Sequence, residues 1–103
     1  MKKIINRDSD LNPIILNTIN FENYKLRFKK PYSFIPIHKE FYYWIIDEYL
    51  EIEMFEESRE ELIKSIYSEI DVIWRNYAKN DIQNLTENAI KLKCKLLDTI
   101  EEV

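Results

Sequence analysis

The 103-residue sequence contains no glycine. Glycine-rich loops let the backbone approach a phosphate closely in P-loop nucleotide-binding proteins and in dinucleotide-binding folds. The absence of glycine excludes both of these nucleotide sites, and we expect no cofactor. It also means that turns depend on Asn, Asp and Pro, which reach the required backbone angles less freely than glycine does.

Cysteine, histidine and long apolar runs are also scarce. The chain has one cysteine, Cys94, and one histidine, His38. A lone cysteine cannot form an internal disulfide, and a single histidine excludes a metal site built from several histidines. No apolar run approaches the ~20 residues that cross a bilayer, and residues 1–20 show no signal-peptide pattern. We therefore expect a cytoplasmic protein that does not contact a membrane.

The composition is that of an ordinary globular domain. Hydrophobic residues make up 46% of the chain and charged residues 33%, and the formal net charge is −4. At this length the chain can build one core, so residues 1–103 are expected to form a single domain. An acidic balance argues against nucleic-acid binding by the whole surface and is compatible with a basic protein partner.

Two adjacent segments, residues 41–46 and 49–55, are predicted to form a β-hairpin. In the second segment Leu50, Ile52 and Met54 alternate with glutamates, which is typical of a strand with one buried face. A turn at Asp47-Glu48 sets the expected register. The inner pairs are then Ile45 with Leu50, Tyr43 with Ile52, and Phe41 with Met54.

The same register defines the outer face of this hairpin. It places Tyr42 and Trp44 beside Glu53 and Glu51, with Ile46 and Tyr49 near the turn. Exposed aromatic surfaces mark interfaces, and Trp and Tyr are enriched among the residues that contribute most to binding. The candidate partner-binding site therefore consists of Tyr42, Trp44, Tyr49, Glu51 and Glu53. Burial of the same face under residues 11–21 is the alternative.

The residues before the hairpin are harder to interpret. Residues 1–22 are expected to be an N-terminal arm, in which the apolar run after Pro13 forms either a short helical turn or an extended segment. Residues 24–29 alternate between aromatic or aliphatic and basic side chains, which predicts a strand. Pro31 and Pro36 limit the next segment to an edge strand or a bent continuation.

Two helices are predicted after the hairpin. Ser58 and Glu61 form a capping box that opens a helix over 58–78, and Thr86 can cap a second helix over 86–101. The fold class that we expect is α+β: an antiparallel three- or four-stranded sheet within residues 24–55, packed on one face by these two C-terminal helices.

Other functions would draw on other residues. Lys25, Arg27 and Lys29 could bind RNA or single-stranded nucleic acid, and His38 with carboxylates could serve a small hydrolase or nuclease. Cys94 lies between two lysines, but on a helix these neighbours point about 100° to either side. No catalytic set or metal-ligand set converges in the sequence, so we expect a non-enzymatic protein without a metal site.

Residues 56–62, Glu-Glu-Ser-Arg-Glu-Glu-Leu, follow the hairpin and open the first helix. They resemble the Gly-x-Thr-x-x-Glu-Ala segment of the HicB-like antitoxin family. Ser58 stands in place of the threonine, Glu61 matches the glutamate, Leu62 replaces the alanine and Glu56 replaces the glycine. The resemblance covers about residues 41–77.

This resemblance implies a toxin-antitoxin function. It implies an αβ antitoxin half that binds and occludes a small basic ribonuclease toxin through a curved antiparallel sheet, as a homodimer or higher oligomer. The DNA-binding segment that family members often append is not evident in this sequence.

Overall fold

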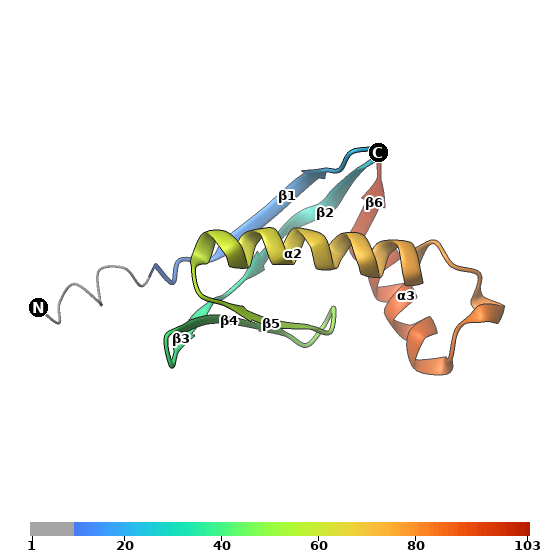
Figure 1. The fold of residues 1–103 in the computed structure, drawn as a ribbon. Helices are drawn as coiled ribbons and strands as arrows, with labels where there is room; N and C mark the ends of the chain where they lie inside the picture. Colours follow the sequence, from blue (N-terminus) through green and yellow to red (C-terminus); the bar gives the residue numbers. More distant parts are fainter. Residues whose placement is uncertain (1–9) are drawn as a thin grey trace, which may run out of the picture.

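The computed structural model describes residues 10–103, and residues 1–9 of the expected N-terminal arm lie outside this range. Within the described part the chain forms two three-stranded antiparallel sheets and two α-helices, so the α+β class is confirmed (Figure 1). The first sheet has the order β1 (Ile14–Asn20), β2 (Lys25–Phe34), β6 (Ile100–Glu102). The second has the order β3 (Ile37–Lys39), β4 (Tyr42–Asp47), β5 (Ile52–Glu56).

The helices begin at the two residues that the sequence indicates. The Ser58 hydroxyl accepts a hydrogen bond from the Glu61 backbone N–H at 3.1 Å, and the Thr86 hydroxyl accepts one from the Ala89 N–H at 3.2 Å. The elements that follow these caps are α2 (Arg59–Ile73), a π-helical turn (Trp74–Ala78), a 3-10 turn (Ile82–Asn84) and α3 (Glu87–Thr99).

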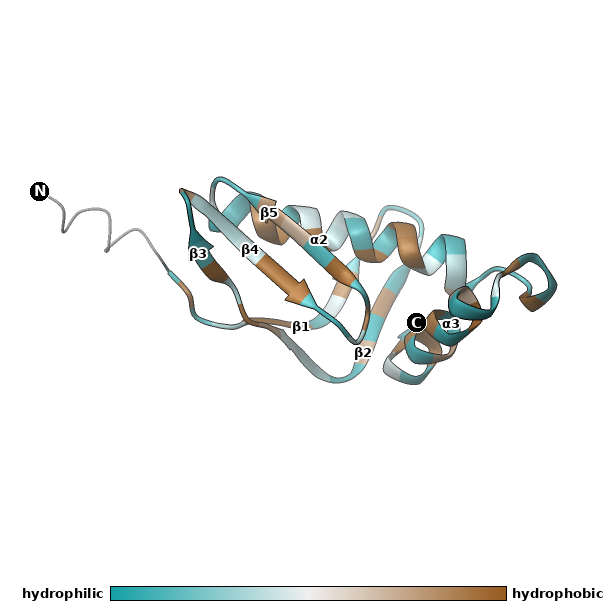
Figure 2. Ribbon diagram, turned by 90° about the horizontal axis from the view of Figure 1, so that it is seen from below, coloured by the Kyte–Doolittle hydropathy of each residue, from teal (hydrophilic) through white to brown (hydrophobic). Residues whose placement is uncertain are grey.

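Helix α2 lies in the angle between the two sheets. In Figure 1 the first sheet passes behind α2 and the β4–β5 hairpin lies below it. In Figure 2, which views the molecule from below, the same hairpin lies in front of α2. The buried stripe of α2 joins one continuous core with apolar residues from both sheets. Its members are Leu62, Ile66, Ile70 and Ile73. Each such side chain contributes about 1.5–3 kcal/mol on full burial.

The segment after Pro13 is extended. β1 pairs with β2, and its register shifts between Leu16 and Thr18. Pro31 lies in the part of β2 opposite this irregularity, where a missing backbone N–H interrupts no regular ladder. β2 is thus the bent continuation that the two prolines allow. Within residues 11–21, Ile14–Asn20 forms β1 and pairs with β2 in the first sheet, instead of lying over the outer face of the hairpin.

The last helix ends two residues earlier than predicted. Ile100 is extended, with φ −129°, and β6 pairs with Leu26–Phe28 of β2. Ile100 is buried. An apolar residue at this position fits the helical stripe of α3 and equally fits the buried face of a strand. Periodicity could not separate these two cases.

The predicted hairpin register is wrong by four residues. Ile45 lies opposite Met54 and Asp47 opposite Ile52, so the turn covers Glu48–Glu51 instead of Asp47-Glu48. A shift by an even number keeps the side chains of β4 and β5 on their predicted faces. The physical reason is Asp47, whose carboxylate accepts from the Leu50 backbone N–H at 3.0 Å and thereby closes the longer turn. Phe41, predicted to face Met54 on the inner side, instead lies in the β3–β4 turn and is 84% exposed.

Asp47 also ties the two sheets together. The Tyr32 hydroxyl on β2 donates to the Asp47 carboxylate on β4 at 2.8 Å. Burial, followed by this hydrogen bond, raises the pKa of Tyr32 well above its ordinary value. Because the pKa of Tyr32 is raised in the folded state, the protonated hydroxyl contributes its full stabilisation of the fold below about pH 10, and this contribution is lost as the pH rises toward the folded-state pKa.

We expect Tyr32→Phe to lower the free energy of unfolding by about 1–2 kcal/mol at pH 7, since the Asp47 carboxylate loses a hydrogen-bond donor. Urea denaturation measures this change. Tyr67→Phe, on the exposed side of α2, is the matched control and should change stability by less than about 0.5 kcal/mol. Equal effects of the two substitutions would contradict the link between the sheets.

Candidate functional site

The outer face of the second sheet carries a group of apolar side chains from all three strands. Their common face follows from the register, because residues directly opposite one another in an antiparallel pair share a face. We call this group the outer patch, and it consists of Ile37, Tyr42, Trp44, Ile46 and Phe55. Ile37, Ile46 and Phe55 are 47%, 57% and 49% exposed, and Tyr42 and Trp44 are half-buried.

The aromatic rings of the outer patch hold one another in place. Trp44 stacks on Phe55 with ring centroids 4.5 Å apart, and Tyr42 meets the edge of Phe55 at 5.1 Å. The Trp44 indole N–H donates to the Lys39 carbonyl at 3.3 Å. These contacts pre-order the rings, so a partner would lose little side-chain entropy in binding them.

Sequence reasoning placed Tyr42, Trp44 and Ile46 on this outer face but missed Phe55 and Ile37. The signal for Phe55 was present, since it follows Glu51 and Glu53 in the same alternation and therefore points outward. It was overlooked because the glutamates identified that face as charged. Ile37 could be added only once β3 was known to pair with β4.

Phe41 extends the apolar surface at the β3–β4 turn. Glu40 and Phe41 form the two-residue loop of this turn, with φ angles of 53° and 72°. Both central residues of a type I′ turn need positive φ, a region that glycine enters without penalty and a residue with a Cβ does not. Phe41 is also 84% exposed. A strained backbone therefore presents a large aromatic ring to solvent beside the outer patch.

Carboxylates gather at the opposite end of the hairpin. Glu53 of β5 lies opposite Ile46, and Glu48 and Glu51 lie in the β4–β5 turn. All three glutamates are exposed. They line a shallow pocket of about 370 Å³ together with Ile46, Asp47 and Ile52. This acidic end is continuous with the outer patch through Ile46.

Tyr49 lies apart from the outer patch. It sits in the β4–β5 turn, and the Lys95 ammonium of α3 lies 5.2 Å from the centre of its ring. This cation–π contact directs Tyr49 toward α3. The structure therefore brings Tyr42 and Trp44 together with Glu53, with Glu51 at the end of the same face and Tyr49 on another side.

The candidate catalytic residues do not converge. His38 lies in β3, where a loop was expected, and its ring meets Tyr43 at a centroid distance of 4.7 Å. Cys94 is exposed, and Lys93 beside it donates to the Ala78 and Asn80 carbonyls at 2.6 and 2.8 Å. Within residues 10–103 no three His, Cys, Asp or Glu side chains are grouped as metal ligands.

Two of the three candidate nucleic-acid-binding residues contact other parts of this chain. Arg27 donates twice to the Glu101 carboxylate of β6, at 2.9 and 2.7 Å. Lys29 donates to the Leu97 carbonyl near the end of α3 at 2.8 Å. Lys25 is exposed. These contacts explain the basic side of β2 without a nucleic acid. Because β2 and the hairpin lie in different sheets, Arg27 and Lys29 pair with β6 and α3 and not with the glutamates of the hairpin.

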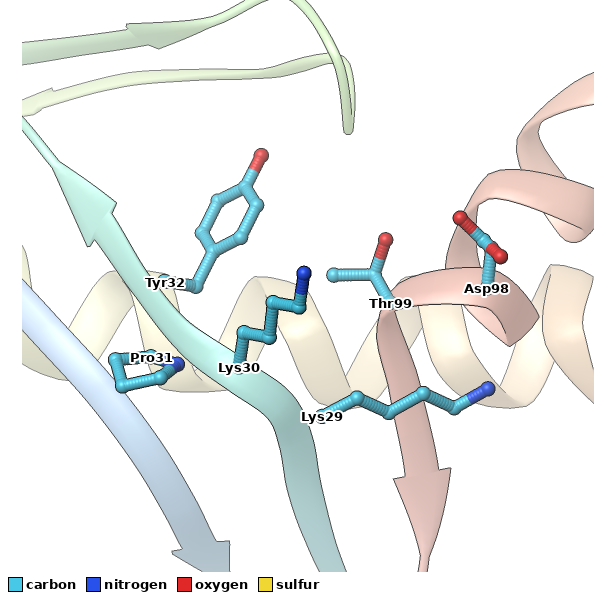
Figure 3. Close-up of a pocket in the computed structure, with 6 residues that line it drawn as sticks. All are labelled: Lys29, Lys30, Pro31, Tyr32, Asp98 and Thr99. Atoms are coloured by element: carbon cyan, nitrogen blue, oxygen red, sulfur yellow. The ribbon is translucent and has the colours of Figure 1, made fainter.

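A pocket of about 400 Å³ lies where β2 meets the end of α3 (Figure 3). Lys30 and Tyr32 extend to the same side of β2, while Lys29 runs toward the end of α3. The hydroxyl of Tyr32 is already bonded to Asp47, and the pocket lining includes the acidic Asp98 as well as Lys29 and Lys30. The negative end of a helix also disfavours a bound anion, so the outer patch is the stronger candidate site.

No family model, curated protein or solved structure matches this chain. Among residues 10–103 there is no helix with the length and apolar character needed to span a bilayer. The outer patch is therefore the feature from which a function can be inferred.

The two tryptophans should differ in their access to solvent. Trp74 is buried, whereas Trp44 is half-exposed in the outer patch. In a Trp74→Phe variant the remaining Trp44 fluorescence should be strongly quenched by acrylamide. In the Trp44→Phe variant the remaining Trp74 fluorescence should be shielded. Equal quenching of both variants would contradict the exposed position of Trp44.

The strain at the β3–β4 turn can be measured by substitution of Phe41. Phe41→Gly should raise the free energy of unfolding by up to about 1 kcal/mol, because relief of a positive-φ penalty of roughly 1–2 kcal/mol exceeds the entropic cost of glycine. Phe41→Ala removes the same ring and keeps the Cβ, so it should not stabilise the protein. Thermal unfolding followed by circular dichroism compares the two. Equal stability of the two variants would show that the turn is unstrained.

Proposed function

We propose that this protein is a non-enzymatic, antitoxin-like binding module that engages a basic protein partner through the outer patch. The observation that supports this most directly is the stacked Trp44–Phe55 pair on an exposed sheet face. Apolar groups gathered on one surface, instead of scattered singly, are typical of a protein interface.

The aromatic rings would provide the anchoring area. Trp and Tyr side chains dominate binding energy when a partner removes them from water, and a few such residues commonly supply most of it. Trp44 and Tyr42 already have restricted rotamers through Phe55 and the Lys39 carbonyl. Phe41 adds a further exposed ring at the turn, and strained residues of this kind concentrate at functional sites.

The acidic end would select the partner. Glu48, Glu51 and Glu53 are exposed, and Glu53 directly adjoins the outer patch. A negative rim attracts a basic protein and raises its association rate more than its final affinity. The net charge of −4 acts in the same direction.

The antitoxin part of the proposal comes from the resemblance to HicB-like proteins. The order of β4, β5 and a helix capped by Ser58 agrees with the order that this resemblance implies. The partner would then be a small basic ribonuclease toxin whose active surface is covered by the outer face of the second sheet. Occlusion of this kind needs no catalytic residue in the antitoxin.

The test is co-expression with the product of any small basic open reading frame that lies beside this gene. We expect a complex that Trp44→Ala weakens at least tenfold, measured by isothermal titration calorimetry, with circular dichroism unchanged. The control is Tyr67→Ala, an exposed aromatic on α2, which should bind like the wild type. Glu53→Lys should slow association and reduce its dependence on salt.

Two outcomes would contradict the proposal. One is a neighbouring gene product that binds equally well to the wild type and to Trp44→Ala. The other combines two negative results. The gene has no basic open reading frame beside it, and affinity capture from source cells finds no basic protein that binds the wild type and Tyr67→Ala but not Trp44→Ala.

A further inference from the structure

The described part of the chain has four sheet edges, formed by β1, β6, β3 and β5. An edge strand exposes unpaired backbone groups, and proteins protect such edges by shortness, charge or proline. β6 has three residues and contains Glu101 and Glu102. β3 has three residues, follows Pro36 and contains Lys39. β5 contains glutamates, so three of the four edges are protected.

β1 is the exception. It has seven residues, Ile-Ile-Leu-Asn-Thr-Ile-Asn, with no charge and no proline. Its one neighbour in the described chain is β2, and Figure 1 shows it as the outermost strand of the first sheet. Ile15, which points away from the core, is 56% exposed. A neutral edge of this length is suited to pairing with another strand.

The burial pattern of β1 indicates which strand would pair with this edge. From Ile15 to Asn20 the side chains run exposed, buried, exposed, exposed, buried, exposed, which is a palindrome centred between Asn17 and Thr18. Residues directly opposite one another in an antiparallel pair lie on the same face. If two copies of β1 pair about that centre, every exposed residue faces an exposed one and every buried residue faces a buried one. The pairs are Ile15 with Asn20, Leu16 with Ile19, and Asn17 with Thr18.

We propose that β1 pairs antiparallel with β1 of a second copy about a twofold axis between Asn17 and Thr18. The two first sheets then form one continuous sheet, with strand order β6-β2-β1-β1-β2-β6. The register of the β1–β2 pair shifts between Leu16 and Thr18, so this irregularity lies beside the proposed axis in both copies. Leu16 and Ile19, both buried in the monomer, align the two cores on the same side of the joined sheet.

A second copy fits this edge better than a charged partner does. Charged partners are matched by opposite charges, and β1 has none. A homotypic pair of neutral strands places no like charges opposite one another. This self-association uses an edge of the first sheet, whereas the proposed function uses a face of the second, so the two can be tested separately.

The first test is mass in solution by light scattering and sedimentation over a range of concentrations. The wild type should reach twice the monomer mass. Asn17→Lys brings two ammonium groups together across the axis and should weaken the dimer about tenfold or more. A mixture of Asn17→Lys with Asn17→Glu should recover the dimer. Ser33→Lys puts the same charge on exposed β2 and should leave the dimer intact.

The second test measures the register. In a Cys94→Ser background, a mixture of Asn17→Cys and Thr18→Cys chains should form an intermolecular disulfide, because opposite Cα atoms about 4.5–5.5 Å apart lie within disulfide range. Ile15→Cys chains alone should not cross-link, since the two copies of residue 15 would be about 16 Å apart along the strands.

The proposal is overturned if the wild type stays monomeric at every concentration, or if Ser33→Lys disrupts the dimer as strongly as Asn17→Lys. It is also overturned if the Ile15→Cys chains cross-link as well as the mixed pair. A dimer that Trp44→Ala abolishes and Asn17→Lys leaves intact would show that self-association uses the outer patch instead.

Discussion

The packing of α2 between two sheets determines most of this structure. Its stripe of four buried side chains faces both sheets at once, so a single helix supplies the centre of the core. Because α2 covers the inner face of the β4–β5 hairpin, the opposite face of that hairpin has no second layer above it in the described chain. The exposed aromatic rings of the outer patch are a consequence of this arrangement.

The lack of glycine has visible structural costs. Glu40, Phe41 and Glu51 occupy positive φ in the two turns of the second sheet, where other proteins would place Gly or Asn. The β4–β5 turn relieves part of this cost through Asp47, which bonds both its own turn and Tyr32 of the other sheet. Among the hydrogen bonds found in residues 10–103, none closes the β3–β4 turn through a side-chain carboxylate as that of Asp47 closes the β4–β5 turn, and Phe41 lies exposed next to the outer patch.

Charged side chains are used unevenly over the surface. On β2 and α3 several of them hold the chain together, as Arg27 does with Glu101 and Lys93 with the end of the π-helical turn. At the β4–β5 turn the glutamates form no ion pair among those found in residues 10–103. The contrast separates a basic surface whose side chains contact other parts of this chain from an acidic one whose glutamates are exposed.

Local periodicity was enough to identify the α+β class, both helix caps and the inward and outward sides of β4 and β5, because these depend on neighbours within a few residues. It also identified Tyr42 and Trp44 as outward-facing aromatics, which the structure shows half-buried. Tertiary structure alone decided the hairpin register, the division of the strands into two sheets, and the addition of β1 and β6. Each of these depends on which distant strand offers a backbone partner or a carboxylate, as Asp47 does for Tyr32 and Glu101 for Arg27, and such partners leave no local pattern in the sequence.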